Sequence, residues 1–137
     1  MTRPTGANMD TMQEIFGDVI HAYTRADALA DGVLVDISPW AQEAGFKYPV
    51  AVTEAVWDII EPSEELQADG QDAVGRAWDL LTILHHGISR SADDEVHFAP
   101  LFVLKPASNA EPVAMYAKCG PGDDGEPVIT IILASED

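Results

Sequence analysis

The stretch from Asp72 to Ser89 constrains the fold of this chain more than any other. Its apolar residues repeat at the spacing of a helix that packs against a core. Leu80 and Ile83 widen the apolar face, whose other members are Val74, Ala77, Trp78, Leu81, Leu84 and Ile88. We therefore expect a long helix here, at the centre of the fold.

Shorter elements precede this helix and are marked by their start and stop residues. Three helices are predicted. The first runs from the N-cap Thr24 to Ala30 and is ended by Gly32. The second starts at Ser38-Pro39 and is ended by Gly45, and the third runs from Glu54 to Ile60, with Thr53 as its N-cap and Pro62 as its stop. Val33 to Ile37 is typical of a short strand. Residues 61 to 72 are expected to be a polar, acidic connection, and residues 1–11 a flexible tail before a single domain, 12–137.

The C-terminal third has a different pattern, that of β-structure. Strands are predicted over Val96–Lys105, Val113–Cys119 and Val128–Leu133, with Pro100 indicating a bulge or an edge position. The run GPGDDGEP between the last two is a strong turn signal and predicts a hairpin. Helices followed by strands indicate an α+β domain, with helices packed on one face of a small antiparallel sheet and a C-terminal β-hairpin.

Composition excludes several classes of protein. The chain has 137 residues and one cysteine, Cys119, so it has no internal disulfide and no zinc site built from cysteines. No apolar run is long enough to span a membrane, and the N-terminal sequence is unlike a secretory signal. We expect a soluble, cytoplasmic protein.

Acidity is the most unusual property of the chain. Twenty-four Asp and Glu against seven Lys and Arg give a net charge of −17. Such a chain repels nucleic acid and anionic membranes and attracts cationic surfaces. A domain of this size carries one net charge per ~400 Å², whereas duplex DNA carries one per ~100 Å². Imitation of DNA therefore requires the carboxylates to gather on one face.

The acidic residues are unevenly placed along the sequence. From Tyr48 to Gly75 there is no Lys or Arg, and we predict that the acids of this stretch form the main partner-binding face: Glu54, Asp58, Glu61, Glu64, Glu65, Asp69 and Asp72. A second predicted group follows Lys118 and comprises Asp123, Asp124 and Glu126. Asp10, Glu14 and Asp18 make a further row if the N-terminal region is helical.

No motif for catalysis or for cofactor binding stands out. Gly120 to Gly125 matches G-x-G-x-x-G, but a strand rather than a helix follows it, so it is a turn. Adjacent helical residues such as His85 and His86 point about 100° apart and cannot chelate one ion. The group of Asp93, Asp94, Glu95 and His97 is interpreted first as a solvated turn and second as a weak divalent-cation site. Cys119, at the end of a strand beside acidic residues, lacks the surroundings of a reactive thiol. We expect no catalytic residue, no metal and no cofactor.

Three stretches resemble a family of short proteins of unknown function carried on bacterial plasmids, integrative elements and phages. They are FGDVIHAYTRADALADGVLVDIS (Phe16 to Ser38), AGFKYPVAVTEAVW (Ala44 to Trp57) and CGPGDDGEPVITIIL (Cys119 to Leu133). The resemblance supplies no activity. It implies a setting in which small acidic proteins resemble anti-restriction or anti-CRISPR factors.

Three hypotheses follow. The first is an anti-defence inhibitor whose acidic face occupies the basic nucleic-acid-binding surface of a host defence complex, without binding nucleic acid or membrane itself. The second is a small enzyme or ligand-binding domain that uses His21, Tyr23 and Asp36. The third is an accessory protein of plasmid maintenance whose acidity serves solubility.

Overall fold

The computed structural model describes residues 23–89 and 94–136, and the fold of these residues is α+β, as predicted. The elements are α1 (Arg25–Asp31), β2 (Leu34–Asp36), α2 (Ser38–Glu43), β3 (Val50–Thr53), α3 (Glu54–Ile60), α4 (Glu64–Ala68), α5 (Ala73–Ser89), β4 (Glu95–Phe98), β5 (Leu101–Phe102), β6 (Glu111–Pro112), β7 (Met115–Pro121), β8 (Pro127–Leu133) and a 3-10 turn (Ala134–Glu136). The tail predicted for residues 1–11 lies outside the described residues, as do Asp10, Glu14 and Asp18.

Five of the described strands form one sheet in the order β2-β3-β8-β7-β4, and β5 pairs with β6 in a separate ribbon. The predicted C-terminal hairpin is confirmed as β7–β8, with Met115 opposite Leu133 and Pro121 opposite Pro127. The expectation of a purely antiparallel sheet needs correction, because β3 and β8 run parallel. A parallel pair requires a long crossover, and here all elements from α3 to β7 lie between the two strands.

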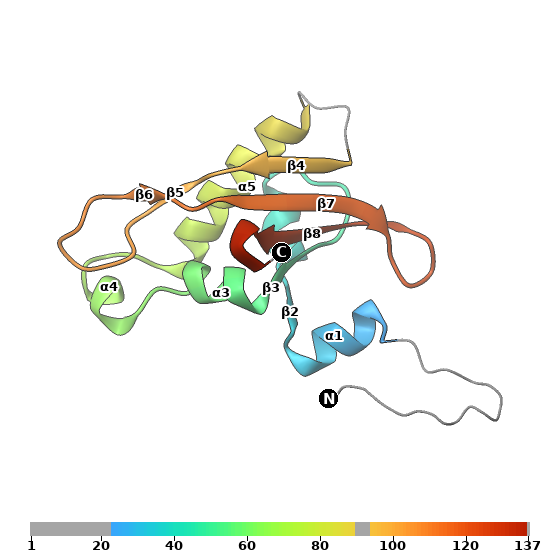
Figure 1. The fold of residues 1–137 in the computed structure, drawn as a ribbon, viewed down its shortest axis with the longest axis horizontal. Helices are drawn as coiled ribbons and strands as arrows, with labels where there is room; N and C mark the ends of the chain where they lie inside the picture. The colour runs from blue at the N-terminus through green and yellow to red at the C-terminus, as the bar shows by residue number, and fades with distance from the viewer. Residues whose placement is uncertain (1–22, 90–93, 137) are drawn as a thin grey trace.

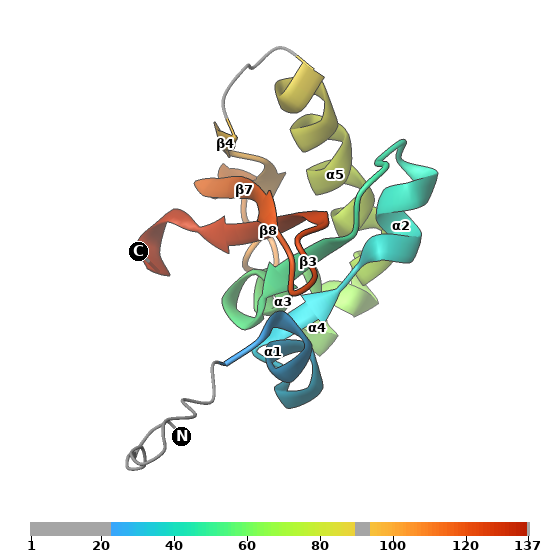
Figure 2. The same cartoon turned by 90° about the vertical axis from the view of Figure 1, so that its right-hand side faces the viewer.

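The helices α2 and α5 cover one face of the sheet, and the 3-10 turn at the C-terminus lies on the other side (Figures 1 and 2). The core lies between this helical layer and the sheet, and α3 contributes Val56 and Ile60 to it. Its completely enclosed members include Val50 and Val52 on β3, Leu80 and Leu84 on α5, and Ile131 on β8. The predicted packing of helices on one face is therefore confirmed.

Helix boundaries in the first half follow the predicted signals. The hydroxyl of Thr24 accepts from the backbone N–H of Asp27, whose carboxylate accepts from the N–H of Thr24, and Gly32 ends α1 with φ of +79°. The Thr53 hydroxyl accepts from the N–H of Val56 and so caps α3. At α2 the prediction is off by one residue, because Ser38 is the first helical residue. Its hydroxyl accepts from the N–H of Val50 at 3.0 Å and so joins α2 to β3.

Two segments differ from their predictions. The connection over residues 61–72 contains a helix, α4, which begins because the Ser63 hydroxyl accepts from the N–H of Leu66, a buried residue. The strand predicted over Val96–Lys105 is divided at the buried Pro100, so that β4 joins the main sheet and β5 joins the ribbon. Proline lacks the N–H that would continue a ladder.

The apolar face of α5 also lies differently from the prediction. The buried residues of α5 include Ala77, Leu80, Leu81 and Leu84. The middle of the buried stripe therefore lies between the directions of Ala77 and Leu80 around the helix axis. Two residues predicted for the core, Val74 and Trp78, lie at its margin and are 55% and 46% exposed, and Ile83 on the other margin is 42% exposed. The helix is therefore central to the core, as expected, but it also presents large apolar side chains to solvent.

Candidate protein-binding surface

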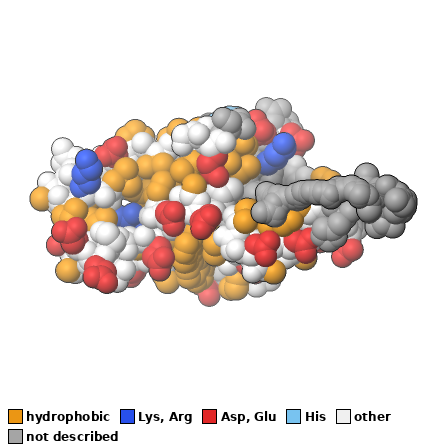
Figure 3. Space-filling view, turned by 60° about the horizontal axis from the view of Figure 1, so that its bottom comes forward, with side chains coloured by type: hydrophobic (Ala, Val, Ile, Leu, Met, Phe, Trp, Pro, Cys, Tyr) orange, Lys and Arg blue, Asp and Glu red, His pale blue; other side chains and the backbone are white. Residues whose placement is uncertain are grey.

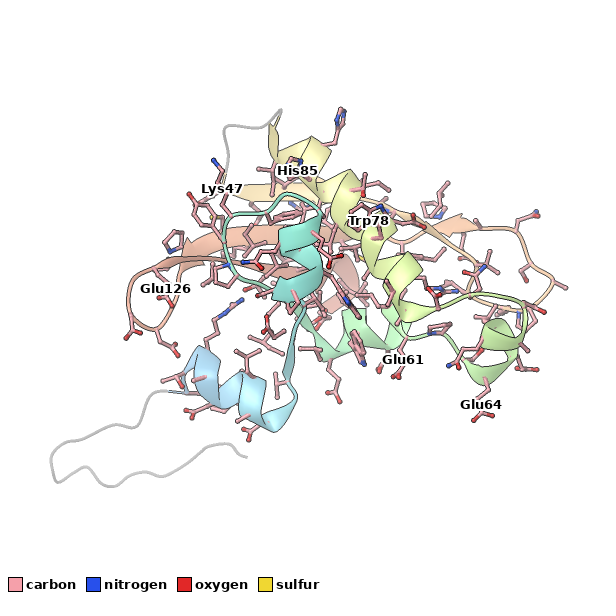
Figure 4. The ribbon with its side chains drawn as sticks, turned by 180° about the vertical axis from the view of Figure 1, so that it is seen from behind. Lys47, Glu61, Glu64, Trp78, His85 and Glu126 are labelled. Carbon is pink, nitrogen blue, oxygen red and sulfur yellow. The ribbon has the colours of Figure 1, made fainter. Side chains whose placement is uncertain are left out.

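The main predicted set of carboxylates lies on α3, on α4 and on the loops that flank α4. Glu54 and Asp58 are one turn apart on α3, and both are exposed. Glu61 follows at the end of α3 in an extended conformation, so the helical row predicted for these three residues covers only the first two. Glu64 and Glu65 occupy the first turn of α4 and are also exposed. Figure 4 shows Glu61 and Glu64 at the same end of the molecule.

The two remaining members of this set lie after α4. Asp69 is the C-cap of α4. Asp72 directly precedes α5 and accepts from the N–H of Gly75, in the first turn of that helix, at 2.6 Å. In the described part of the chain, none of the seven carboxylates forms an ion pair with Lys or Arg. The charges of this region are therefore not paired with any Lys or Arg side chain that the structure describes.

The arginine that follows this stretch in the sequence is turned into the protein. Arg76 is only 4% exposed, and its two terminal nitrogens donate to the carbonyl oxygens of Ile59, at 2.7 Å, and Val103. Its guanidinium lies over the ring of Phe102, 5.4 Å from the centroid, and its Nε is buried without a hydrogen-bond partner. Burial lowers the pKa of Arg76 below its ordinary value. The cation that could neutralise the acids is used to join α3, α5 and the segment after β5.

A surface hollow of about 480 Å³ lies among these residues. Glu61 and Asp72 line it from opposite ends of the α4 segment, together with Pro62, Gln67, Gly70, Gln71 and Ala73. The amide of Gln67 donates to the carbonyl oxygen of Pro62 at 2.9 Å and fixes one wall. Carboxylate and amide oxygens accept hydrogen bonds from ammonium and guanidinium groups. The hollow can therefore accept a basic side chain.

The second predicted set, at the β7–β8 turn, has a different environment. The Asp123 carboxylate accepts from the backbone N–H groups of Arg25, at 2.8 Å, and Ala26, at 3.0 Å, and so binds the first turn of α1. Glu126 accepts from the N–H of Asp124 at 3.0 Å and closes the turn. These bonds give Asp123 and Glu126 a structural role.

An arginine lies within reach of the same carboxylates. The Arg25 side chain donates to the Thr130 hydroxyl at 2.6 Å and to the Ile129 carbonyl oxygen at 3.0 Å. Burial lowers its pKa more than the nearby charges of Asp36, Asp123 and Glu126 raise it. These acids are partly neutralised, unlike those around α4.

The two predicted sets do not form one patch, since Glu126 lies at the opposite end of the molecule from Glu61 and Glu64 (Figure 4). On the side drawn in Figure 3, acidic side chains recur along the lower margin from the α4 end to the α1 end, with hydrophobic side chains between them. The surface of 7986 Å² gives about 470 Å² per net charge, against ~100 Å² for duplex DNA. The acids are therefore grouped by region but spaced more widely than phosphates.

Of the residues considered for other chemistry, those that the structure describes are not brought together into one site. The Tyr23 hydroxyl donates to Asp31, whereas Asp36 accepts from Ser38, and His21 lies outside the described residues. Glu95 and His97 are in contact at 3.2 Å on the exposed surface of β4. Among residues 23–89 and 94–136 no three His, Cys, Asp or Glu side chains are placed to hold a metal ion.

The tryptophans are surface features that the sequence patterns missed. Trp40 on α2 and Trp57 on α3 are half-buried and stacked, with ring centroids 6.2 Å apart and planes 18° from parallel. Trp78 on α5 is more exposed. The exposure of Trp78 could have been inferred from the width of the apolar face of α5. A helix in a two-layer domain buries only one stripe, so residues at the margins of a wider apolar face remain exposed.

Comparison with known proteins defines a family but no activity. The model of a family of unknown function (DUF6573) matches residues 12–137. No curated protein and no solved structure matches the chain. Of the helices in the described residues, none combines the length and apolar character needed to cross a membrane.

Proposed function

The chain belongs to the DUF6573 family, and we propose that it is a binding inhibitor that occupies the basic, nucleic-acid-binding surface of another protein. The observation that carries this proposal is the group of exposed carboxylates on α3, α4 and the flanking loops. No described Lys or Arg pairs with them, and Arg76 is buried. We call this group the α3–α4 acidic surface: Glu54, Asp58, Glu61, Glu64, Glu65, Asp69 and Asp72.

Physical chemistry supports this use of the surface. Unpaired carboxylates close together raise the free energy of the folded chain by a few tenths of a kcal/mol per pair. A basic partner removes that repulsion and is attracted from a distance, so association is fast and sensitive to salt. Because the average charge density is below that of DNA, the partner is recognised by local groups and not by imitation of a duplex.

The resemblance to proteins of mobile elements makes the proposal more specific. A host defence complex, of the restriction or CRISPR type, binds DNA or guide RNA along basic channels. The inhibitor would compete with nucleic acid for such a channel. The acidic surface would enter the channel, with the hollow between Glu61 and Asp72 accepting a lysine or arginine side chain.

A competition assay tests the proposal. A purified restriction or Cascade-type complex is bound to fluorescent DNA, and displacement of the DNA by this protein is followed by anisotropy at low and high salt. We expect inhibition that weakens as salt rises, and a loss of about tenfold or more when Glu61, Glu64 and Glu65 are all replaced by lysine.

The matched control is the triple replacement of Asp94, Glu95 and Asp124 by lysine. It changes the net charge equally at exposed positions, which lie at the start of β4 and in the β7–β8 turn. The control should inhibit almost as well as the unaltered protein. Equal inhibition by both variants, or inhibition that does not depend on salt, would rule out the α3–α4 acidic surface as the binding site.

A further inference from the structure

The three tryptophans of the chain lie on the three helices that share the core with one face of the sheet. Trp40 and Trp57 are half-buried and stacked across α2 and α3, whereas Trp78 on α5 is 46% exposed. Val74, one turn before Trp78 on the same side of α5, is 55% exposed. We call these four side chains the tryptophan surface.

Trp78 lies on the flank of α5 that faces α2. His85 is seven residues further along the helix and so lies on the same flank. Its ring is in edge contact with Phe46, just after α2, at 5.3 Å between centroids. Figure 4 shows Trp78 projecting from α5 beside α2. Ile83 lies on the opposite flank, that of Arg76, because a helix turns by about 100° per residue.

Large exposed apolar side chains such as Val74 and Trp78, one turn apart on α5, are typical of binding surfaces. Exposed apolar patches with a polar rim mark sites where another molecule docks. Tryptophan in particular is enriched among the residues that contribute most to protein–protein affinity. Its ring offers a large contact area with little loss of conformational freedom.

The charges around the tryptophan surface indicate what covers it. Exposed carboxylates lie on all three helices, with Glu43 on α2, Glu54 and Asp58 on α3, and Asp79 on α5. Neither α2 nor α3 contains Lys or Arg, and the arginine of α5 is the buried Arg76. An apolar centre with an acidic rim is complementary to an apolar side chain flanked by basic ones.

We propose that the tryptophan surface binds an amphipathic basic helix of the partner, with its apolar side chains on Trp78 and Val74 and its Lys or Arg residues toward the acidic rim. Such docking of a helix by its apolar face is a recurrent mode of recognition. The inference rests on the proposed function, because it identifies the part of the basic partner that is recognised by packing as well as by charge.

Two synthetic peptides of identical composition test this inference. One arranges leucine and lysine so that a helix has an apolar face, and the other has the same residues in an order that gives no such face. Binding is followed by the anisotropy of a labelled peptide and by the intrinsic tryptophan fluorescence. We expect the amphipathic peptide to bind about tenfold more tightly and to shift the emission to shorter wavelength, as the indole rings leave water.

Variants on the two flanks of α5 decide whether the tryptophan surface is responsible. Trp78→Ser and Val74→Ser should remove most of the preference for the amphipathic peptide. Ile83→Ser, at a position of similar exposure on the opposite flank, should leave it unchanged. Equal binding of the two peptides by the unaltered protein, or equal effects of Trp78→Ser and Ile83→Ser, would overturn the inference.

The lysine triple variant at Glu61, Glu64 and Glu65 separates this inference from the proposed function. If it weakens both peptides while Trp78→Ser has no selective effect, the acidic surface stands and the docking of a helix does not. If it weakens neither peptide and inhibits as well as the unaltered protein, the proposed function fails.

Discussion

The two ends of the molecule use their carboxylates in opposite ways. At the β7–β8 turn, Asp123 accepts from two backbone N–H groups of α1, and Arg25 lies near it. At the α3–α4 end, Glu64 and Glu65 are exposed on a helix, and Arg76 is turned inward onto carbonyl oxygens. Carboxylates of the same chain thus serve the fold at one end and remain available to a partner at the other.

This difference shows that a count of acids says little about their role. What distinguishes the two ends is the position of the arginine and the number of carboxylates bound to backbone N–H groups. Asp123 and Glu126 make such bonds at the β7–β8 turn, and Asp72 makes one at the start of α5. A carboxylate bound in this way serves the fold, whereas an exposed one such as Glu64 contributes mainly to the external field. The binding surface should be sought where the local cation is buried.

Replacing Arg76 should have the largest effect on the fold. Arg76→Ala removes two donors to carbonyl oxygens and the contact with Phe102, and leaves a cavity beside α3 and α5. We expect the free energy of unfolding to fall by about 3 kcal/mol, as for other broken buried interactions. Urea denaturation measures this loss. Arg76→Met, which keeps much of the side-chain volume, should lose less.

The pH dependence of the Arg76 effect follows from the direction of its pKa. The pKa of Arg76 is lower in the folded protein than in the unfolded chain. The free energy of unfolding would therefore rise only as pH increases through the folded-state pKa. Arginine stays protonated at every pH used for such measurements. The loss in Arg76→Ala should therefore be the same at pH ~6 and pH ~9. A clear difference between the two would assign the effect to another group.

Replacing Asp123 should have an intermediate effect and should affect the other end of the molecule. Asp123→Ala removes the acceptor of two N–H groups at the start of α1 and should lower the free energy of unfolding by about 1–2 kcal/mol. Asp124→Ala serves as the control, and since its carboxylate is exposed in the same turn, it should change stability by less than ~0.5 kcal/mol. Thermal unfolding compares the two. Equal stabilities would mean that the turn does not hold α1.

Local signals in the sequence predicted much of the fold. The Thr24 and Thr53 caps and the stop at Gly32 depend on neighbouring residues alone, and each is confirmed. The hairpin turn lies within the predicted run GPGDDGEP but is shorter, because Gly120 and Pro121 still belong to β7. The parallel pairing of β3 with β8 was not predicted, because strand order is decided by packing between residues far apart in the chain. The short strand β3 also lacks the alternation of a half-buried strand, since Val50, Ala51 and Val52 are all buried.

The candidate site was predictable only in part. The absence of Lys and Arg from Tyr48 to Gly75 is visible in the sequence, and it located the α3–α4 acidic surface. The inward turn of Arg76 and the bonds of Asp123 to α1 were not visible, because both depend on contacts between distant segments. Trp78 was assigned to the core because its spacing fits that of the buried residues, and helical periodicity alone does not give the width of the packed stripe.

The smallest expected effect concerns salt, and it compares the two ends directly. Salt screens repulsion among exposed like charges, so the free energy of unfolding should rise with salt, by up to ~1 kcal/mol between low and moderate ionic strength. Replacing Glu61, Glu64 and Glu65 by glutamine should reduce this rise more than replacing Asp94 and Asp124 by asparagine and Glu95 by glutamine, although the net charge changes equally. Repulsion depends on the distance between charges, and the first three lie close together on and beside α4.

Urea denaturation at several salt concentrations measures, for each variant, the slope of the free energy of unfolding against salt. If the slopes are equal, net charge alone governs stability, and the α3–α4 end is electrostatically no different from the rest of the surface.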